Sequence, residues 1–263
     1  MNPFFLVIVE IIYRPIFNLL LLFLVIFNLN LGVAIIILTL FVRLLLLKPT
    51  LAGNKMQKEM TDLQPKLKEI QEKYKNDQQK MAEETMSVFK KHGSGPLKGC
   101  LMLLVQIPVF IGLFFVIRNF SETEGKLDMT YLYSFLEFIN VRGVDISQVN
   151  TVFFGIDLLS SGSIALTIIA PLLLFLQMKL TMLNRPSMPT NMPGAENMPD
   201  MTKMMGYMNI ALSTMMAFFV YTMPAGIGLY IATTTLFGVI QFSIQYRQLI
   251  KAKLMSLKGG SQT

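Results

Sequence analysis

Long apolar runs, each close to the length of a membrane-crossing helix, constrain this chain more than any other feature. An α-helix rises about 1.5 Å per residue, so about 20 residues cross roughly 30 Å of hydrocarbon. Hydrophobic residues make up 53% of the chain and charged residues only 15%, which excludes a soluble globular domain. We therefore expect an all-α membrane protein with five transmembrane helices, from runs at 31–48, 97–117, 163–183, 204–222 and 225–246.

Lysines and arginines are distributed unequally over the segments that connect these runs. Eighteen of the 23 fall at the end of the first run, before the second, around the connection from third to fourth, and in the C-terminal tail. The opposite side carries only Arg14, Arg118, Lys126 and Arg142. Cytoplasmic segments are enriched in basic residues. The chain is therefore expected to have its N-terminus outside and its C-terminus in the cytoplasm.

The stretch before the first run allows two interpretations. Residues 15–27 are apolar, and Asn28 and Asn30 separate them from the first run. Glu10 and Arg14 are four residues apart, which is a pairing distance on a helix. We favour an interfacial amphipathic helix within residues 1–30, lying on or partly in the outer leaflet. The alternative is a sixth span from Phe4 to Phe27, which would place the N-terminus inside.

The whole chain then divides as follows. Residues 1–30 form the N-terminal interfacial region, 31–48 the first span, 49–96 a cytoplasmic helical hairpin and 97–118 the second span. An extracytoplasmic loop covers 119–151, and the third span with a preceding short helix covers 152–183. A Met- and Pro-rich cytoplasmic loop (184–203), the fourth span (204–223), the fifth span (224–247) and a cytoplasmic tail (248–263) follow.

Apolar residues spaced by three and four within 49–96 predict two helices with matched faces. Asn76-Asp77 predicts the turn between them, and Pro65 interrupts the first pattern, where a kink is expected. Two matched stripes favour a docking element over a plain solvated connector. The stripe residues are Met56, Met60, Leu63, Leu67, Ile70, Tyr74, Met81 and Phe89.

One arginine, Arg43, lies inside an apolar run. A cation at the bilayer centre costs about 2.5–3.5 kcal/mol on insertion scales. Thr39 is one turn earlier, so the two side chains share a helix face. Two interpretations stay open: Arg43 snorkels toward the cytoplasmic end near Lys48, or it lines a hydrated groove. The spans also carry neutral polar residues that would line such a groove, among them Gln106, Gln177, Tyr230 and Thr234.

Several kinds of chemistry have no motif in this sequence. It lacks a phosphate-binding Gly-rich loop ending in Lys-Ser/Thr, a His-Glu-x-x-His pair and a Gly-x-Ser-x-Gly turn. The single Cys100 and the single His92 do not make a metal-ligand cluster. Acidic residues are essentially missing from the apolar runs, which weakens an ion-coupled transporter. We expect no enzyme activity, no cofactor and no metal, with a small-solute channel or transporter and an intramembrane enzyme as weaker alternatives.

Five sequence blocks extend over nearly the whole chain. They are GVAIIILTLFVRLLLLKP (32–49), LQPKLKEIQEKYK (63–75), KKHGSGPLKGC (90–100) running into LVQIPVF (104–110), FFGIDLL (153–159) with FLQMK (175–179), and MPAGIGLY (223–230). In these blocks and in their order, the chain resembles the YidC/Oxa/Alb family of membrane protein insertases.

The resemblance implies a groove that is open to the cytoplasm and the lipid but closed to the outside. It implies that Arg43, Thr39 and Gln177 lie in this groove. A substrate's hydrophilic tail would enter it while the apolar helix slides into lipid, without nucleotide hydrolysis. The cytoplasmic hairpin would receive substrates. One departure is Ile231, where the family commonly has an aromatic residue.

The resemblance also implies partners and a location. The partners are nascent or newly made membrane proteins and the lipid bilayer, with the Sec translocon, the signal recognition particle with its receptor, and the ribosome as candidates. Direct sequence-specific binding of nucleic acid is not expected. The chain resembles a minimal bacterial form located in the cell membrane.

Overall fold

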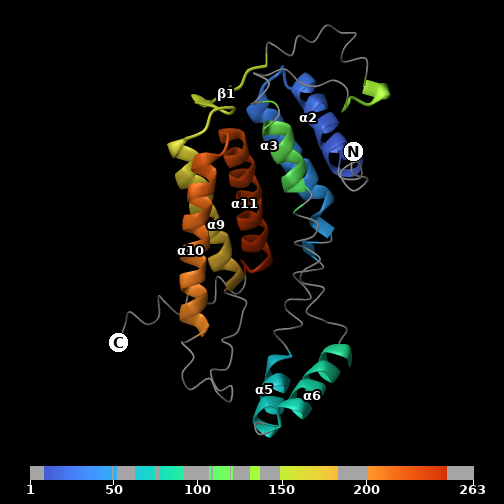
Figure 1. Cartoon of the computed structure of the whole chain (residues 1–263), viewed down its shortest axis with the longest axis vertical. Helices are drawn as coiled ribbons and strands as arrows, with labels where there is room; N and C mark the ends of the chain where they lie inside the picture. The colour runs from blue at the N-terminus through green and yellow to red at the C-terminus, as the bar shows by residue number, and fades with distance from the viewer. Residues whose placement is uncertain are drawn as a thin grey trace. The chain divides into compact units, whose positions relative to one another are not determined.

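The residues that the structure describes are mostly helical. This computed structural model describes residues 9–48, 50–51, 63–74, 77–91, 107, 109–118, 120, 131–136, 149–182 and 201–247. A two-stranded antiparallel hairpin is formed by β1 Val152–Phe153 and β2 Ile156–Asp157. The helices (Figure 1) are η1 Val9–Tyr13, α2 Arg14–Ile26, α3 Leu31–Leu45, α5 Gln64–Lys73, α6 Gln78–Lys91, η3 Ser134–Leu136, α9 Ile164–Met182, α10 Met201–Thr222, α11 Ala225–Gln245 and an unlabelled apolar helix Val109–Arg118.

Three helical stretches in the described residues are long and apolar enough to cross a membrane. They are Val9–Ile26, Ile164–Thr181 and Ala225–Gln245, while Leu31–Leu45 and Val109–Arg118 are shorter apolar helices. A helical chain with several membrane-spanning helices is therefore confirmed. The number of five spans and their direction stay predictions.

The chain divides into two compact units. One unit comprises Met1–Leu46, Leu104–Leu174 and Ser213–Gly238, and it contains α2, α3 and the hairpin β1–β2. The other comprises Leu47–Leu103, Phe175–Leu212 and Val239–Thr263, and it contains α5 and α6. The candidate site described below lies entirely within the first unit.

A turn with two left-handed residues separates α2 from α3. Asn28 and Leu29 have φ angles of 52° and 59°. Asn30 then caps α3, since its side-chain oxygen accepts a hydrogen bond from the backbone N–H of Val33 at 3.0 Å. Asparagine suits both roles, because its short amide tolerates positive φ and satisfies free N–H groups at a helix start. The two asparagines therefore end one helix and begin the next, as the sequence predicts.

One face of α2 is packed inside the protein, and the opposite face is apolar as well. Phe17 and Leu24 are fully buried, whereas Ile26 is 56% exposed. A helix that is apolar all round suits a lipid environment. The stretch Val9–Ile26 also has the length of a membrane span. Both interpretations of the N-terminal region, lying on the membrane and crossing it, therefore stay open.

The polar side chains of α2 are occupied by bonds to another segment of the protein. Arg14 pairs with Glu10 at 2.9 Å, as their spacing predicts, and its guanidinium lies 4.8 Å from the centre of the Tyr133 ring. The buried amide of Asn18 donates to the carbonyl of Tyr131 at 2.8 Å and accepts from the N–H of Tyr133 at 2.8 Å. These bonds fasten the segment Tyr131–Tyr133 to α2, and they leave α2 without a water-facing polar stripe.

Backbone hydrogen bonds tie the segment between residues 150 and 162 to three helix ends of the first unit. The segment reaches the start of α3, the end of α10 and the start of α11. Backbone bonds of this kind are insensitive to side-chain identity, so they fix the ends of these helices whatever side chains line the segment. The bonds are Leu31 N to Asn150 O (3.1 Å), Asn150 N to Leu29 O (2.9 Å), Gly162 N to Tyr221 O (2.9 Å), Ala225 N to Ser160 O (2.8 Å) and Gly226 N to Leu158 O (2.7 Å).

The sequence predicts a short helix at the beginning of 152–183. This prediction is wrong, because residues 152–157 form the hairpin β1–β2 instead. Phe154 and Gly155 make its two-residue turn, with φ angles of 49° and 76°. Two successive left-handed residues suit the twist of a tight hairpin and cannot continue a right-handed helix. The preceding Phe153 packs against Gly32 of α3, which holds the hairpin in place.

The structure has two helices, α5 and α6, in the segment where the sequence predicts a helical hairpin (Figure 1). Asp77 lies at the turn, and its carboxylate accepts a hydrogen bond from Lys80 N at 3.1 Å. Pro65 lies in the first turn of α5, where proline is tolerated, so the expected kink is absent from this helix. Of the stripe, Leu63 is buried and Leu67, Ile70, Tyr74 and Met81 are partly buried, while Met56, Met60 and the Phe89 side chain lie outside what the structure describes.

Adding one methyl group at Gly32 is predicted to destabilise the protein, whereas the same change at Gly206 is not. A Cβ at Gly32 would overlap the Phe153 ring, while a Cβ at Gly206 in α10 meets nothing within 4 Å. Overpacking costs about 1–3 kcal/mol, and alanine gains up to about 1 kcal/mol over glycine inside a helix. Thermal unfolding in detergent should show a lower midpoint for Gly32→Ala and an equal or higher one for Gly206→Ala. Equal midpoints for both variants would contradict the packing of the hairpin on α3.

Candidate functional site

A hydrogen bond between two helices holds Arg43, the arginine of the apolar helix α3. Arg43 Nε on α3 donates to Thr234 Oγ1 on α11 at 2.6 Å. A hydrogen bond to a charged group contributes about 1.5–3 kcal/mol, which is comparable to the insertion cost of about 2.5–3.5 kcal/mol for the cation. The bond directs the side chain toward α11. This direction favours a pocket role for Arg43 over snorkelling toward Lys48.

A small pocket of about 10 Å³, roughly the space of one water molecule, surrounds this bond. Its polar lining consists of Thr39, Arg43, Tyr230 and Thr234, with no carboxylate among the lining residues. In the part of the chain that the structure describes, Thr234 is the one hydrogen-bond partner of Arg43. The remaining guanidinium N–H groups therefore bond to no other described residue. The apolar lining consists of Ile16, Leu38, Val42, Leu46, Val109 and Leu113.

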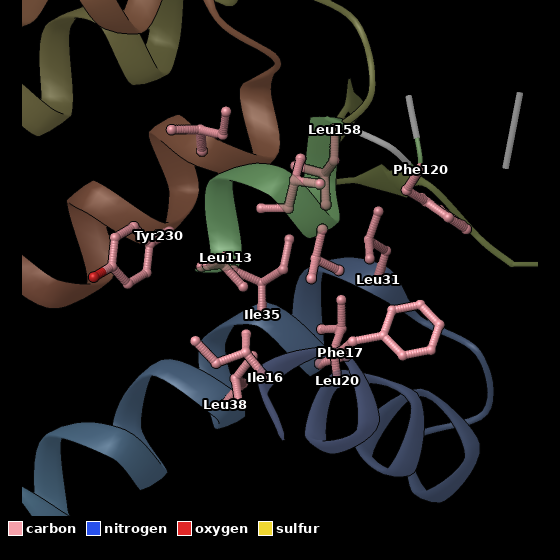
Figure 2. Close-up of a cluster of buried hydrophobic side chains, with 14 of the residues drawn as sticks. Ile16, Phe17, Leu20, Leu31, Ile35, Leu38, Leu113, Phe120, Leu158 and Tyr230 are labelled. Atoms are coloured by element: carbon pink, nitrogen blue, oxygen red, sulfur yellow. The ribbon is translucent and has the colours of Figure 1, made fainter. Parts of the chain in front are cut away.

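Thr39 and Tyr230 contribute to the pocket in different ways. The hydroxyl of Thr39 donates to the carbonyl of Ile35 at 2.6 Å, so Thr39 offers the pocket an oxygen that accepts rather than donates. The ring of Tyr230 lies 6.1 Å from that of Phe110, centre to centre. Figure 2 shows its hydroxyl pointing away from the buried apolar cluster. Together with Arg43, these groups make one wall of the pocket polar within an otherwise apolar surrounding.

A layer of buried apolar side chains packs near the ends where α3 and α11 begin, and Figure 2 shows Leu31, Ile35, Leu113 and Leu158 among them. Gly226 on α11 permits this packing, since a Cβ there would meet the Leu158 carbonyl at 3.2 Å and Ile35 Cδ1 at 3.3 Å. Each member of the layer is at most 2% exposed. The layer therefore lies nearer to these helix ends than Arg43 and Thr234 do. Its members are Leu31, Ile35, Leu113, Ile117, Leu158 and Ile227.

The structure brings together four of the six groove residues that the sequence suggests. Arg43, Thr39, Tyr230 and Thr234 line the same pocket. Gln106 lies outside the described residues. Gln177 is on α9 and partly buried, and its assignment to the groove stays a prediction. The functional role of all six residues is likewise a proposal.

The sequence alone does not predict the positions of two residues, Ile231 and Ile16, relative to the pocket. Ile231, which stands where the family commonly has an aromatic residue, is 5% exposed and belongs to the apolar core rather than to the pocket lining. Ile16 of α2 does line the pocket, although the sequence indicates only an apolar helix there. No group of three His, Cys, Asp or Glu side chains that could hold a metal occurs among the described residues.

Comparisons with known proteins identify the family. Residues 22–252 match the family described as 60Kd inner membrane protein. The membrane protein insertase YidC of Oceanobacillus iheyensis is 35% identical over 220 residues, which cover 82% of this chain and 74% of that protein. The membrane protein insertase YidC of Chloroherpeton thalassium is 31% identical over 213 residues, covering 80% of this chain and 32% of that protein.

A solved structure agrees with these relatives. The crystal structure described as an active YidC insertase with the first transmembrane domain resolved superposes with a TM-score of 0.57 at 28% identity. The match covers 89% of this chain and 46% of that one. The chain therefore belongs to the 60Kd inner membrane protein family, a family of helical multi-pass membrane proteins. The resemblance predicted from the five sequence blocks is confirmed, and the bacterial relatives indicate a bacterial membrane protein.

Removing the hydroxyl at position 234 is predicted to destabilise the protein only while the arginine is present. Thr234→Val leaves a partly buried charged donor without its acceptor, at a cost of about 1–3 kcal/mol. In an Arg43→Met background the same change should cost much less, because no donor remains unsatisfied. Thermal unfolding of the two single variants and the double variant in detergent measures this coupling.

Thr235→Val is the matched control, since the hydroxyl of Thr235 bonds only to carbonyls of its own helix among the described residues. It should cost less than Thr234→Val and show little coupling to Arg43→Met. Equal effects of the two threonine substitutions in both backgrounds would show that the bond between α3 and α11 adds no stability.

Proposed function

We propose that this chain is a membrane protein insertase and chaperone that acts without hydrolysing nucleotide. A substrate's short hydrophilic segment enters the pocket, and its transmembrane helix passes into lipid. The observation that carries the proposal is the pairing of Arg43 with Thr234 inside a pocket, with a buried apolar layer nearer to the starts of α3 and α11. Membership of a family whose matched relatives are named insertases supports it.

The proposed topology has five spans, with the N-terminus outside and the C-terminus in the cytoplasm. The excess of basic residues on one side supports this direction. In this orientation the starts of α3 and α11 face outward, so the buried layer is the outer barrier and the pocket communicates with the cytoplasm and the lipid. A polar segment held in the pocket has a shorter apolar distance left to cross, which lowers its transfer cost.

Arg43 acts in this scheme as a fixed positive charge that attracts acidic substrate tails. Its N–H groups beyond Nε provide hydrogen bonds for a carboxylate. Two unit charges about 4 Å apart attract by about 4 kcal/mol at an effective dielectric constant of about 20. The membrane potential then pulls the acidic tail outward, at about 2.3 kcal/mol per charge per 100 mV. Gln106 and Gln177 complete the proposed groove.

The hairpin α5–α6 is the proposed site of substrate recruitment. Its apolar stripe offers a surface for the hydrophobic segment of a newly made membrane protein. The Sec translocon, the signal recognition particle with its receptor, and the ribosome are proposed as partners that deliver these substrates. The proposed location is the bacterial cytoplasmic membrane.

Insertion into liposomes that contain only the purified chain tests the proposal. The substrate is a small single-span protein with an acidic translocated tail, and protection of that tail from added protease reports insertion. Liposomes with the chain should protect the tail well above empty liposomes. Protection no higher than in empty liposomes would contradict an autonomous insertase, and a solute conductance without insertion would favour a channel.

Arg43→Glu should impair insertion of acidic tails about tenfold or more. The substitution replaces an attraction of about 1–4 kcal/mol between the tail and position 43 by a repulsion of similar size. Neutral tails of the same length should lose much less. The matched control is Arg247→Glu, which reverses an exposed cation at the end of α11. Equal losses for acidic and neutral tails would mean that Arg43 has only a structural role.

A further inference from the structure

The tip of the hairpin β1–β2 carries the most exposed large apolar side chain in the described part of the chain. Phe154 is 90% exposed, and the neighbouring Val152 is 50% exposed. The backbone of Phe154 has a φ of 49°, a conformation that aromatic residues seldom adopt. A tight turn of this type strongly favours Asn or Asp at this position, followed by glycine. The chain thus keeps a phenylalanine where both turn chemistry and contact with water disfavour it.

Packing contacts and backbone hydrogen bonds hold the segment that carries Phe154. Its ring meets that of Phe153 edge-on, with the centres 4.6 Å apart, and Phe153 packs against Gly32 at the start of α3. Ile156, two residues after Phe154, pairs with Phe153 in the hairpin. The backbone bonds of residues 150–162 fix the same segment to the starts of α3 and α11. The exposed ring is therefore presented by a fixed scaffold and is not the side chain of a loose loop.

The apolar surface at the tip leads directly to the lipid-facing surface of a candidate membrane span. α9 begins seven residues after β2 and contains the candidate span Ile164–Thr181. Ile164, Ile168 and Leu172 follow each other at spacings of four residues and are 71%, 61% and 63% exposed. Such an apolar stripe on a spanning helix faces hydrocarbon. Figure 1 shows the hairpin beside the start of this helix.

We propose that the hairpin β1–β2 is a membrane anchor whose Phe154 ring inserts into the lipid leaflet at the start of α9. Aromatic and apolar side chains at the level of the lipid headgroups hold membrane proteins at a set depth. Because the hairpin is bonded to α3 and α11, this anchor sets the depth of the helices that carry Arg43 and Thr234. The proposal concerns lipid contact and is independent of whether the protein acts as an insertase.

Fluorescence of a single tryptophan tests the anchor directly, because the chain contains no tryptophan of its own. Phe154→Trp is reconstituted into phosphatidylcholine and phosphatidylglycerol vesicles. Emission should shift to shorter wavelength, iodide should quench it weakly, and lipids spin-labelled near the headgroup should quench it more than lipids labelled at the chain end. Met86→Trp on the exposed face of α6 is the water reference, and Ile168→Trp on α9 is the reference for deeper lipid.

Other outcomes overturn the anchor. Emission and iodide quenching like those of Met86→Trp would place the tip in water, where a protein partner would become the alternative. Blue-shifted emission that neither iodide nor spin-labelled lipid quenches would place it in a protein interface, such as one with a second copy. If Phe154→Trp fails to fold, Phe154→Cys in a Cys100→Ala background, carrying an environment-sensitive dye, gives the same readout.

Discussion

A guanidinium within an apolar helix must find a polar partner, and the arrangement of the first unit follows from this requirement. Arg43 reaches Thr234 across the contact between α3 and α11, at 2.6 Å. The bond offsets much of the cost of the cation, and the described lining of the pocket around it contains no carboxylate. A guanidinium that is hydrogen-bonded to a neutral hydroxyl keeps its positive charge, and this charge is suited to attract an acidic chain transiently. In a buried ion pair at the same place, a carboxylate of the protein would already neutralise the guanidinium and leave no charge for a substrate.

The second requirement is a barrier on one side of this charge. The layer around Ile35 and Ile227 is packed without exposure, and Gly226 permits the close approach that completes it. Backbone hydrogen bonds from residues 150–162 then hold the helix ends beyond the layer. Under the proposed function, this layer would limit the passage of ions on the outer side, while the opposite end would accept a substrate. A polar pocket and an apolar seal within the same few helices are what one-sided insertion needs.

Several parts of this arrangement follow from the sequence, and others depend on packing that no local pattern encodes. The shared face of Thr39 and Arg43 follows from helical spacing, and the break at Asn28 and Asn30 follows from their conformational preferences. The sequence suggests Thr234 as a groove residue, but it does not predict the hydrogen bond to Arg43, because Thr233, Thr234 and Thr235 are adjacent and the packing of α11 decides which one reaches Arg43. The sequence does not predict the hairpin β1–β2, because Phe154 occupies a turn position that its residue type disfavours.

We propose that the pocket around Arg43 is wet and reachable from one side only. Thiol accessibility tests it most directly, in a Cys100→Ala background with one new cysteine on α3. Val42 lines the pocket, whereas Leu44 is 60% exposed on the outside of the same helix, where lipid is expected. A membrane-impermeant thiol reagent should label Val42→Cys from the cytoplasmic side alone and leave Leu44→Cys unlabelled. Labelling of Val42→Cys from the outer side, or no labelling from either side, would contradict it.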